Sequence, residues 1–236
     1  RPLADQPLPA ARERPYFLFV GRRGTYKNFA VAIAGLRASA LIDHELLCFG
    51  GGAFDDAELE SIAVTGLCGR VHRIGGGGDI MTKDTFRSFD LRFEWKISKA
   101  GNSGVMYRVG TGDPQPYFSG PEYQVLDNDE HPDGKLETHR AGALYDLIAP
   151  AKKAVKPVGQ WNAARIVIDG NRVEHYLNGE KVVATEFDGP EWKKLVAASK
   201  FKDWERFGKV VDGHIDFQDH GDEVWYRKIR IKRLDE

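Results

Sequence analysis

The 236 residues suffice for one large all-β domain or for two smaller domains. Charged residues make up 29% of the chain and the formal net charge is −1, so the composition does not indicate a surface for nucleic acid or anionic membranes. The two cysteines, Cys48 and Cys68, are too few for a disulfide framework or a zinc knuckle.

The N-terminal third alternates apolar runs with helical patterns. Residues 16–20 and 44–50 are short apolar runs typical of strands buried on both faces, and residues 71–74 are a third candidate. Residues 28–40 carry apolar side chains at helical spacing, and residues 55–63 predict a short acidic helix. This strand–helix–strand–helix–strand order predicts a parallel α/β segment.

This segment resembles the start of a known domain. The run from Phe19 to Asn28 is similar to the opening of the nucleotide-sugar domain of retaining glycosyltransferases built from two Rossmann-like domains, and residues 48–52 are similar to its second strand and loop. The resemblance implies that Arg22 and Lys27 neutralise donor phosphates, as fixed cations near a helix N-terminus do. The rest of that sheet and the acceptor domain are missing, so a solvated turn is the favoured interpretation of both residues.

Beyond the tetraglycine at residues 75–78 the pattern changes. Residues 89–97 alternate apolar and polar side chains, the clearest half-buried strand in the chain. Asn178-Gly179 is the strongest two-residue hairpin signal. Further strands are expected at residues 105–109, 165–168, 173–177, 181–185, 214–218 and 224–232. These regularly spaced strands predict a mainly β sandwich of antiparallel sheets, with one helical stretch at residues 192–201.

Residues 78–236 resemble the 3-keto-disaccharide hydrolase family. The matching segments, in order, are Gly78–Thr82, Phe89–Trp95, Gly101–Arg108, Gly120–Asp127, Ala141–Asp146, Gly159–Asn162 and Gln218–Gly221. The resemblance implies a concanavalin-like jelly roll with a concave sugar-binding face. Such domains usually begin some tens of residues earlier, where this chain has the transferase-like segment. The chain is therefore interpreted as a chimera: a partial Rossmann-like segment at 1–74, a glycine linker at 75–78 and a jelly roll at 79–236.

The family resemblance implies substrates oxidised at C3 of one sugar. The ketone acidifies the C2 hydrogen, so a base can remove it, the glycosidic oxygen on C1 can leave, and water can then add. Glu122 and Gln124 share one face of an expected strand, and Glu122 is the expected acid/base carboxylate. Arg108 is expected as a cation on a facing strand. His220 is expected as the second proton-transfer group, because imidazole is the side chain best suited to exchange protons near neutral pH. A solvated edge strand and a structural Arg108–Glu122 ion pair are the open alternatives.

The remaining candidate residues concern substrate and metal. Side chains expected to bind sugar are those of Asn102, Gln124, Asp127, Tyr145, Gln218 and Trp161, the last by stacking on a ring. For Tyr145 and Trp161 the favoured alternative is a place in the core, where such aromatic residues are found more often than in ligand platforms. The sequence establishes no cofactor, but a divalent metal ion held by Glu122, Asp127 and His220 would polarise the 3-keto oxygen.

Three functions remain open from the sequence. The leading hypothesis is a carbohydrate-active hydrolase of 3-keto-glycosides whose partner is a small saccharide. The alternatives are a non-catalytic carbohydrate-binding jelly roll and a nucleotide-sugar-binding fragment. Neither nucleic acid nor membrane is an expected partner, and the oligomeric state is open. The chain shows no signal peptide, although the resemblance implies a periplasmic or secreted protein.

Overall fold

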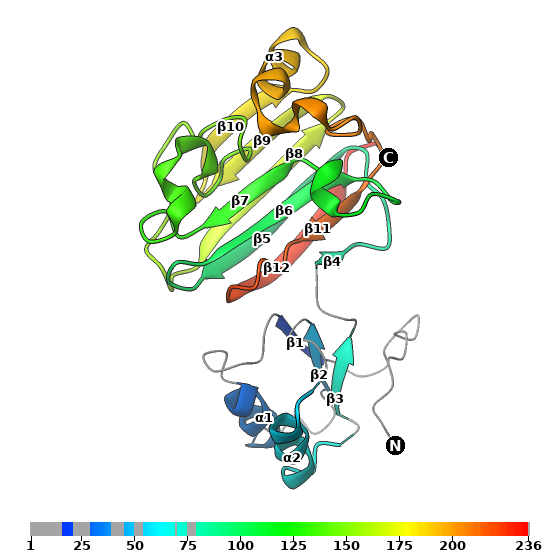
Figure 1. Ribbon diagram of the computed structural model, residues 1–236, viewed down its shortest axis with the longest axis vertical. Coiled ribbons are helices and arrows are strands. Elements are labelled where there is room, and N and C mark those ends of the chain that lie inside the picture. The colour runs from blue at the N-terminus through cyan, green and yellow to red at the C-terminus, as the bar shows by residue number, and fades with distance from the viewer. Residues whose placement is uncertain are drawn as a thin grey trace. The chain divides into compact units, whose positions relative to one another are not determined.

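The computed structural model describes residues 16–20, 29–38, 45–49, 54–68, 70–74 and 79–235. The chain divides into two compact units (Figure 1). Arg1–Gly78 and Asp219–Glu223 make up the first unit, and Asp79–Gln218 and Val224–Glu236 make up the second. Each unit has its own hydrophobic core. None of the described helices is long and apolar enough to cross a lipid bilayer.

The first unit contains a three-stranded parallel sheet in the order β1 (Tyr16–Val20), β2 (Glu45–Phe49) and β3 (Val71–Ile74). Helix α1 (Phe29–Ala38) joins the first two strands, and helix α2 (Asp56–Val64) joins the second and third. These elements follow the strand–helix–strand order expected from the sequence. The tetraglycine at residues 75–78 lies outside the described residues.

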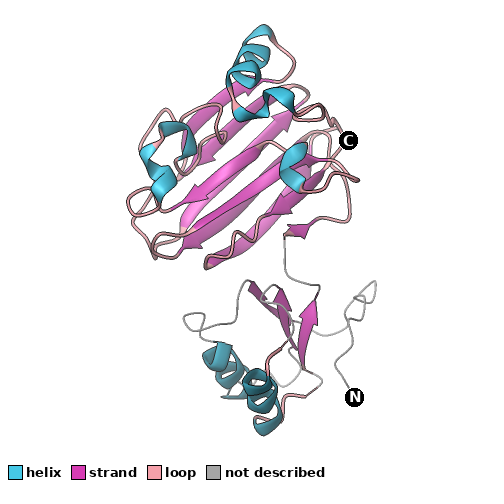
Figure 2. Cartoon of the chain, in the orientation of Figure 1, coloured by secondary structure: helices cyan, strands magenta, loops and turns pink. Residues whose placement is uncertain are grey.

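The second unit is a sandwich of two antiparallel sheets (Figure 2). One sheet has five strands in the order β10 (Glu180–Glu186), β9 (Arg172–Leu177), β8 (Asn162–Asp169), β5 (Phe89–Ile97) and β12 (Val224–Arg233). The other has four strands in the order β4 (Ile80–Met81), β11 (His214–Phe217), β6 (Asn102–Val109) and β7 (Glu122–Leu126). The expected mainly β fold with two antiparallel sheets is confirmed.

Alternation along the strands explains how the sandwich forms. Every second side chain of β5, from Phe89 to Ile97, is buried, while the residues between them are partly or fully exposed. The β9–β10 turn is formed by Asn178 and Gly179, with φ values of 51° and 87°, which is the left-handed backbone that this turn requires. The buried faces of both sheets contribute to one core.

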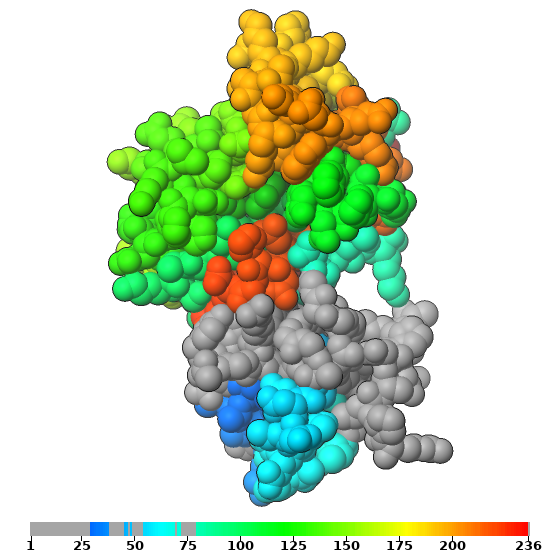
Figure 3. All heavy atoms as spheres, in the orientation of Figure 1, coloured from blue at the N-terminus to red at the C-terminus, as the bar shows by residue number. Residues whose placement is uncertain are grey.

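Short helices fill the connections of the sandwich: η1 (Pro116–Phe118), η2 (Pro132–Lys135), η3 (Glu137–His139), α3 (Pro190–Ala198) and η4 (Lys200–Asp203). Figure 3 shows the α3–η4 segment, in yellow and orange, at one end of the sandwich. The sequence predicts one helix at residues 192–201, but the helix ends before Ser199. The Ser199 hydroxyl accepts a hydrogen bond from the backbone N–H of Phe201 at 3.1 Å and so begins a separate turn.

Candidate active site

Three side chains form a row across the four-stranded sheet, on the face away from the core. Asp216 of β11 is paired with Met106 of β6, which is paired with Glu122 of β7. Directly paired residues project from the same face. Their neighbours Val105 and Tyr123 project to the other face and belong to the core. Glu122 is partly exposed, whereas Asp216 and Met106 are fully buried. This surface is called the Glu122 face below.

The lack of a side chain at Gly104 leaves room for the Glu122 side chain on this face. Gly104 of β6 is paired with Gln124 of β7, beside the Met106–Glu122 pair. A Cβ atom at position 104 would lie 1.9 Å from Glu122 Oε1 and 2.5 Å from its carboxyl carbon. Because Gly104 has no side chain, the Glu122 carboxyl group lies directly against the backbone of residue 104. Any other residue at this position would displace the carboxyl group.

The environment of Glu122 makes it a stronger base than an ordinary glutamate. Its pKa is raised to about 8, mainly because burial disfavours the charged carboxylate. The Lys200 ammonium opposes this rise, whereas Asp79 and Asp133 add to it. Burial also raises the pKa of Asp216, and the negative charges of Asp79 and Glu122 act in the same direction. A carboxyl group with its pKa near 8 can exchange protons near neutral pH.

Lys200, the first residue of η4, is the cation that acts on Glu122. Its Nζ lies 4.1 Å from the centre of the Tyr145 ring, within the range of a cation–π contact. The backbone N–H of Tyr145 donates to the backbone oxygen of Glu122 at 3.0 Å, which joins the Tyr145 segment to the edge of β7. Tyr145 therefore links the lysine to the strand that bears the carboxylate.

A polar network holds Tyr145 and Lys200 in place. The Tyr145 hydroxyl donates to Asp133 Oδ2 at 3.4 Å, and the Tyr145 ring lies 4.4 Å from the His139 ring. His139 Nε2 lies 2.9 Å from Asp146 Oδ1, and Asp146 Oδ2 accepts the backbone N–H of Lys200 at 3.2 Å. Tyr145 is thus part of the site predicted from the sequence, through contacts that the sequence did not indicate.

The expectation that Arg108 faces Glu122 is wrong. The β6 strand has a bulge opposite β11 at this point, and Arg108 has a φ of 55°. A bulge redirects a side chain. The guanidinium group donates to the backbone oxygen of Gly170 at 2.7 Å and lies 3.9 Å from the centre of the Phe187 ring, next to strands of the five-stranded sheet. The alternative of an Arg108–Glu122 ion pair is wrong for the same reason.

The metal-binding residues proposed from the sequence are Glu122, Asp127 and His220. Asp127 Oδ2 accepts a hydrogen bond from the backbone N–H of Ala100 at 2.7 Å, and its Oδ1 accepts one from the backbone N–H of Asp129 at 3.1 Å. This carboxylate therefore holds two loop segments together. His220 is exposed and lies in the Asp219–Glu223 segment of the first unit. No group of three or more His, Cys, Asp or Glu in the described parts of the chain is arranged to hold a metal ion. The role of His220 in proton transfer stays a prediction.

The remaining predicted sugar-binding residues are dispersed. Trp161 lies next to the five-stranded sheet, with the guanidinium carbon of Arg227 only 3.8 Å from its ring centre, so it is not a stacking platform beside Glu122. Gln124 is buried on the Glu122 face, as the alternation predicts. Asn102 is a buried residue of β6, and Gln218 follows β11. Sugar binding by these last three stays a prediction.

Arg22 and Lys27 lie outside the described residues, so their phosphate-binding role also stays a prediction. Sequence reasoning did not single out Lys200, Asp216 or Asp79. Each was visible as a polar residue in a recognised helix, strand or matching segment, but only the strand register and the η4 turn place them near Glu122.

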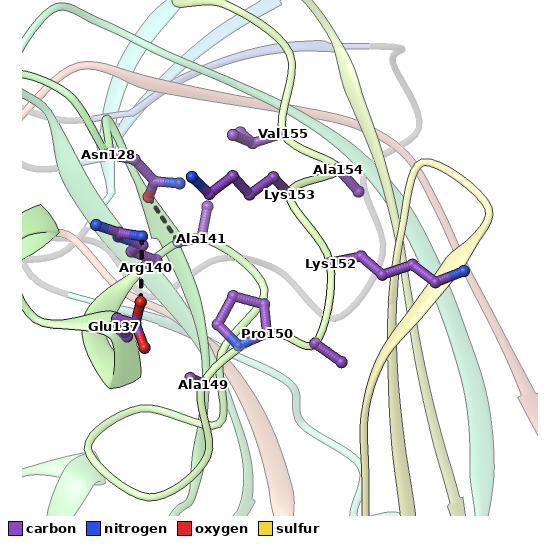
Figure 4. A pocket seen from close by; sticks show the side chains of 11 residues that line it. Asn128, Glu137, Arg140, Ala141, Ala149, Pro150, Lys152, Lys153, Ala154 and Val155 are labelled. Atoms are coloured by element: carbon purple, nitrogen blue, oxygen red, sulfur yellow. Dashed lines mark hydrogen bonds and ion pairs between the residues drawn. The ribbon is translucent and has the colours of Figure 1, made fainter.

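A separate hollow of about 170 Å³ opens beyond the end of β7. Figure 4 shows Asn128, Arg140 and Lys153 among its lining side chains. Asn128 Oδ1 accepts the backbone N–H of Ala141 at 2.8 Å, and Arg140 pairs with Glu137 at 3.9 Å. None of the residues of the Glu122 face described above lines this hollow, so it is not part of the candidate active site.

Comparison with known families gives a match over most of the chain. Residues 53–232 match the model of the 3-keto-alpha-glucoside-1,2-lyase-like domain. This match begins before helix α2, some 25 residues ahead of the resemblance noted in the sequence. A 3-keto-disaccharide hydrolase of Bacteroides thetaiotaomicron is 40% identical over an alignment of 184 residues, and the match covers 68% of this chain and 63% of that protein. The chain thus spans less than two thirds of this relative's length.

Two solved structures are also similar to this chain. A putative glycosyl hydrolase from Parabacteroides distasonis is 33% identical with a TM-score of 0.63, over 66% of this chain and 76% of the other. A second putative glycosyl hydrolase from the same organism is 27% identical with a TM-score of 0.52, over 66% of this chain and 83% of the other. Since the family model covers most of its length, this chain belongs to the family of 3-keto-alpha-glucoside-1,2-lyase-like domains.

Proposed function

We propose that this chain cleaves glycosides that carry a ketone at C3, by removing the C2 proton and eliminating the glycosidic oxygen from C1, with Glu122 as the base. Membership of the family and the name of the Bacteroides relative support this substrate class. The observation that carries the proposal is the Glu122 carboxyl group, which is partly exposed, has its pKa raised to about 8, and lies under the influence of the Lys200 ammonium.

The chemistry follows from the ketone. Glu122 takes the C2 proton, and the electron pair of the C–H bond forms an enolate with its negative charge on the C3 oxygen. Lys200 stabilises that charge electrostatically. When the enolate returns to the ketone, a C1–C2 double bond forms and the C1–oxygen bond breaks, and the leaving oxygen gains a proton. Addition of water across the double bond then completes net hydrolysis.

Asp79 and Asp133 serve this step by acting on the base. Their negative charges disfavour a further negative charge on Glu122. Glu122 therefore binds a proton more tightly than an ordinary glutamate, which is what a base removing a carbon-bound proton requires.

The test is to incubate the protein with 3-keto-trehalose or a 3-keto-glucoside and to measure the monosaccharide released. Glu122→Gln should abolish release while leaving sugar binding intact, because the amide keeps the shape and loses the basic oxygen. Glu191→Gln, on an exposed residue of α3, is the matched control. An unchanged rate in Glu122→Gln would refute the assignment. Binding without any release by the wild type would instead favour a non-catalytic carbohydrate-binding domain, and a parallel assay with chelator tests the prediction of a divalent ion.

A further inference from the structure

The register of the five-stranded sheet lines up cations that are far apart in the sequence. Arg230 of β12 is paired with Arg92 of β5, Arg92 with Arg165 of β8, and Arg165 with Tyr176 of β9. Lys181 of β10 is paired with Tyr176 and ends the row. Neighbouring strands lie about 4.8 Å apart, so the three arginines span about 10 Å on the outer face of the sheet. This row is called the arginine row below.

The arginine row carries more positive than negative charge. Asp90 accepts two hydrogen bonds from Arg92 and two from Arg165, all between 2.9 and 3.1 Å. The single negative charge of Asp90 is thus shared between two guanidinium groups. In the part of the chain that the structure describes, Arg230 forms no ion pair. Like charges directly opposite one another destabilise a sheet. Asp90 offsets this repulsion between Arg92 and Arg165, whereas Arg230, directly opposite Arg92, has no such carboxylate among the described residues.

The row borders a hollow of about 290 Å³. Its lining includes the three arginines, Lys228, Tyr176 and one carboxylate, that of Glu94. Small residues leave the space open, namely Ala163, Ala164 and Gly179. The hollow is slightly below the size typical of drug-sized ligands, so it fits a single ring with its substituents better than an extended polymer face.

We infer that this hollow is a second binding site, which takes a sugar unit bearing sulfate or carboxylate groups within an acidic glycan. The Arg230 guanidinium fork matches the planar or tetrahedral oxygens of carboxylate and sulfate and can hold them through two hydrogen bonds. Arg92 and Arg165, whose Nε and Nη2 atoms donate to Asp90, add their Nη1 donors. The inference does not depend on the chemistry at Glu122, which lies on the other sheet.

The experiment measures affinity by calorimetry for a heparin oligosaccharide, an oligogalacturonate and a neutral dextran oligosaccharide. A DNA duplex and anionic phospholipid vesicles of matched charge serve as the competing classes. We expect binding to the acidic glycans but not to dextran, weakening as salt is added. The tighter of the two acidic glycans identifies the group recognised.

Arg230→Glu should weaken this binding at least tenfold, because it replaces the arginine that forms no ion pair by a carboxylate. Arg230→Lys keeps the charge but loses the guanidinium fork, so its affinity should lie between those of the wild type and Arg230→Glu. Lys193→Glu on α3 makes the same change in net charge away from the row and should bind as the wild type does. Full affinity in Arg230→Glu, an equal loss in Lys193→Glu, or tighter binding to DNA or vesicles than to either glycan would overturn the inference. Release of monosaccharide from a 3-keto-glucoside should be unchanged in Arg230→Glu, which separates this test from that of the proposed function.

Discussion

Adding one methyl group at Gly104 tests the candidate active site directly. The Cβ atom of Gly104→Ala would lie 1.9 Å from Glu122 Oε1, whereas real Cβ contacts are essentially never shorter than 3.0 Å. The carboxyl group must therefore move by about 1 Å or more. A displacement of about 1 Å of a reacting group can cost about 10²-fold in rate, and we expect a loss of that order in kcat.

The cost in stability should be smaller than the cost in rate. The group that moves is the end of a flexible, partly exposed side chain, so overpacking should lower the free energy of unfolding by no more than about 1–3 kcal/mol. The assay measures release of glucose from a 3-keto-glucoside, alongside urea unfolding. Gly35→Ala, in α1 with nothing within 4 Å of the added methyl, is the control and should leave the rate unchanged. A folded Gly104→Ala protein with the rate of the wild type would show that the position of Glu122 does not matter for catalysis.

Two further predictions concern charge and pH. If Glu122 is the base, kcat/KM should rise with pH through about 8, because the base acts when deprotonated. Lys200→Met should lower kcat about 10²-fold and move the midpoint of this pH profile upward, since Lys200 lowers the pKa of Glu122. The control Lys202→Met should change neither kcat nor the midpoint. The raised pKa of Asp216 means that the folded state holds a proton that the unfolded state releases, so stability should fall as pH rises above the ordinary carboxyl pKa, by up to about 1.4 kcal/mol per pH unit. Glu122, whose pKa is also raised, contributes to the same trend. Asp216→Asn should therefore reduce, but not abolish, the fall in stability with pH measured by urea unfolding; an unchanged slope would contradict the raised pKa of Asp216.

The sequence by itself determined most of the secondary structure and the fold class. Alternation at residues 89–97 predicts β5 at its observed bounds, and Asn178-Gly179 predicts the β9–β10 turn, because both signals depend on side-chain direction and backbone freedom over a few residues. The same local alternation places Glu122 and Gln124 on one face of β7. These features are local, so a local pattern suffices to predict them.

Only the tertiary structure decided which charged groups meet. A bulge of one residue takes Arg108 away from Glu122, whereas a turn more than 70 residues along the chain supplies Lys200 instead. The arginine row depends in the same way on the register of separate strands. Register and bulges are set by the packing of whole sheets, and a shift of one residue sends a side chain to the opposite face, so no short stretch of sequence contains this information.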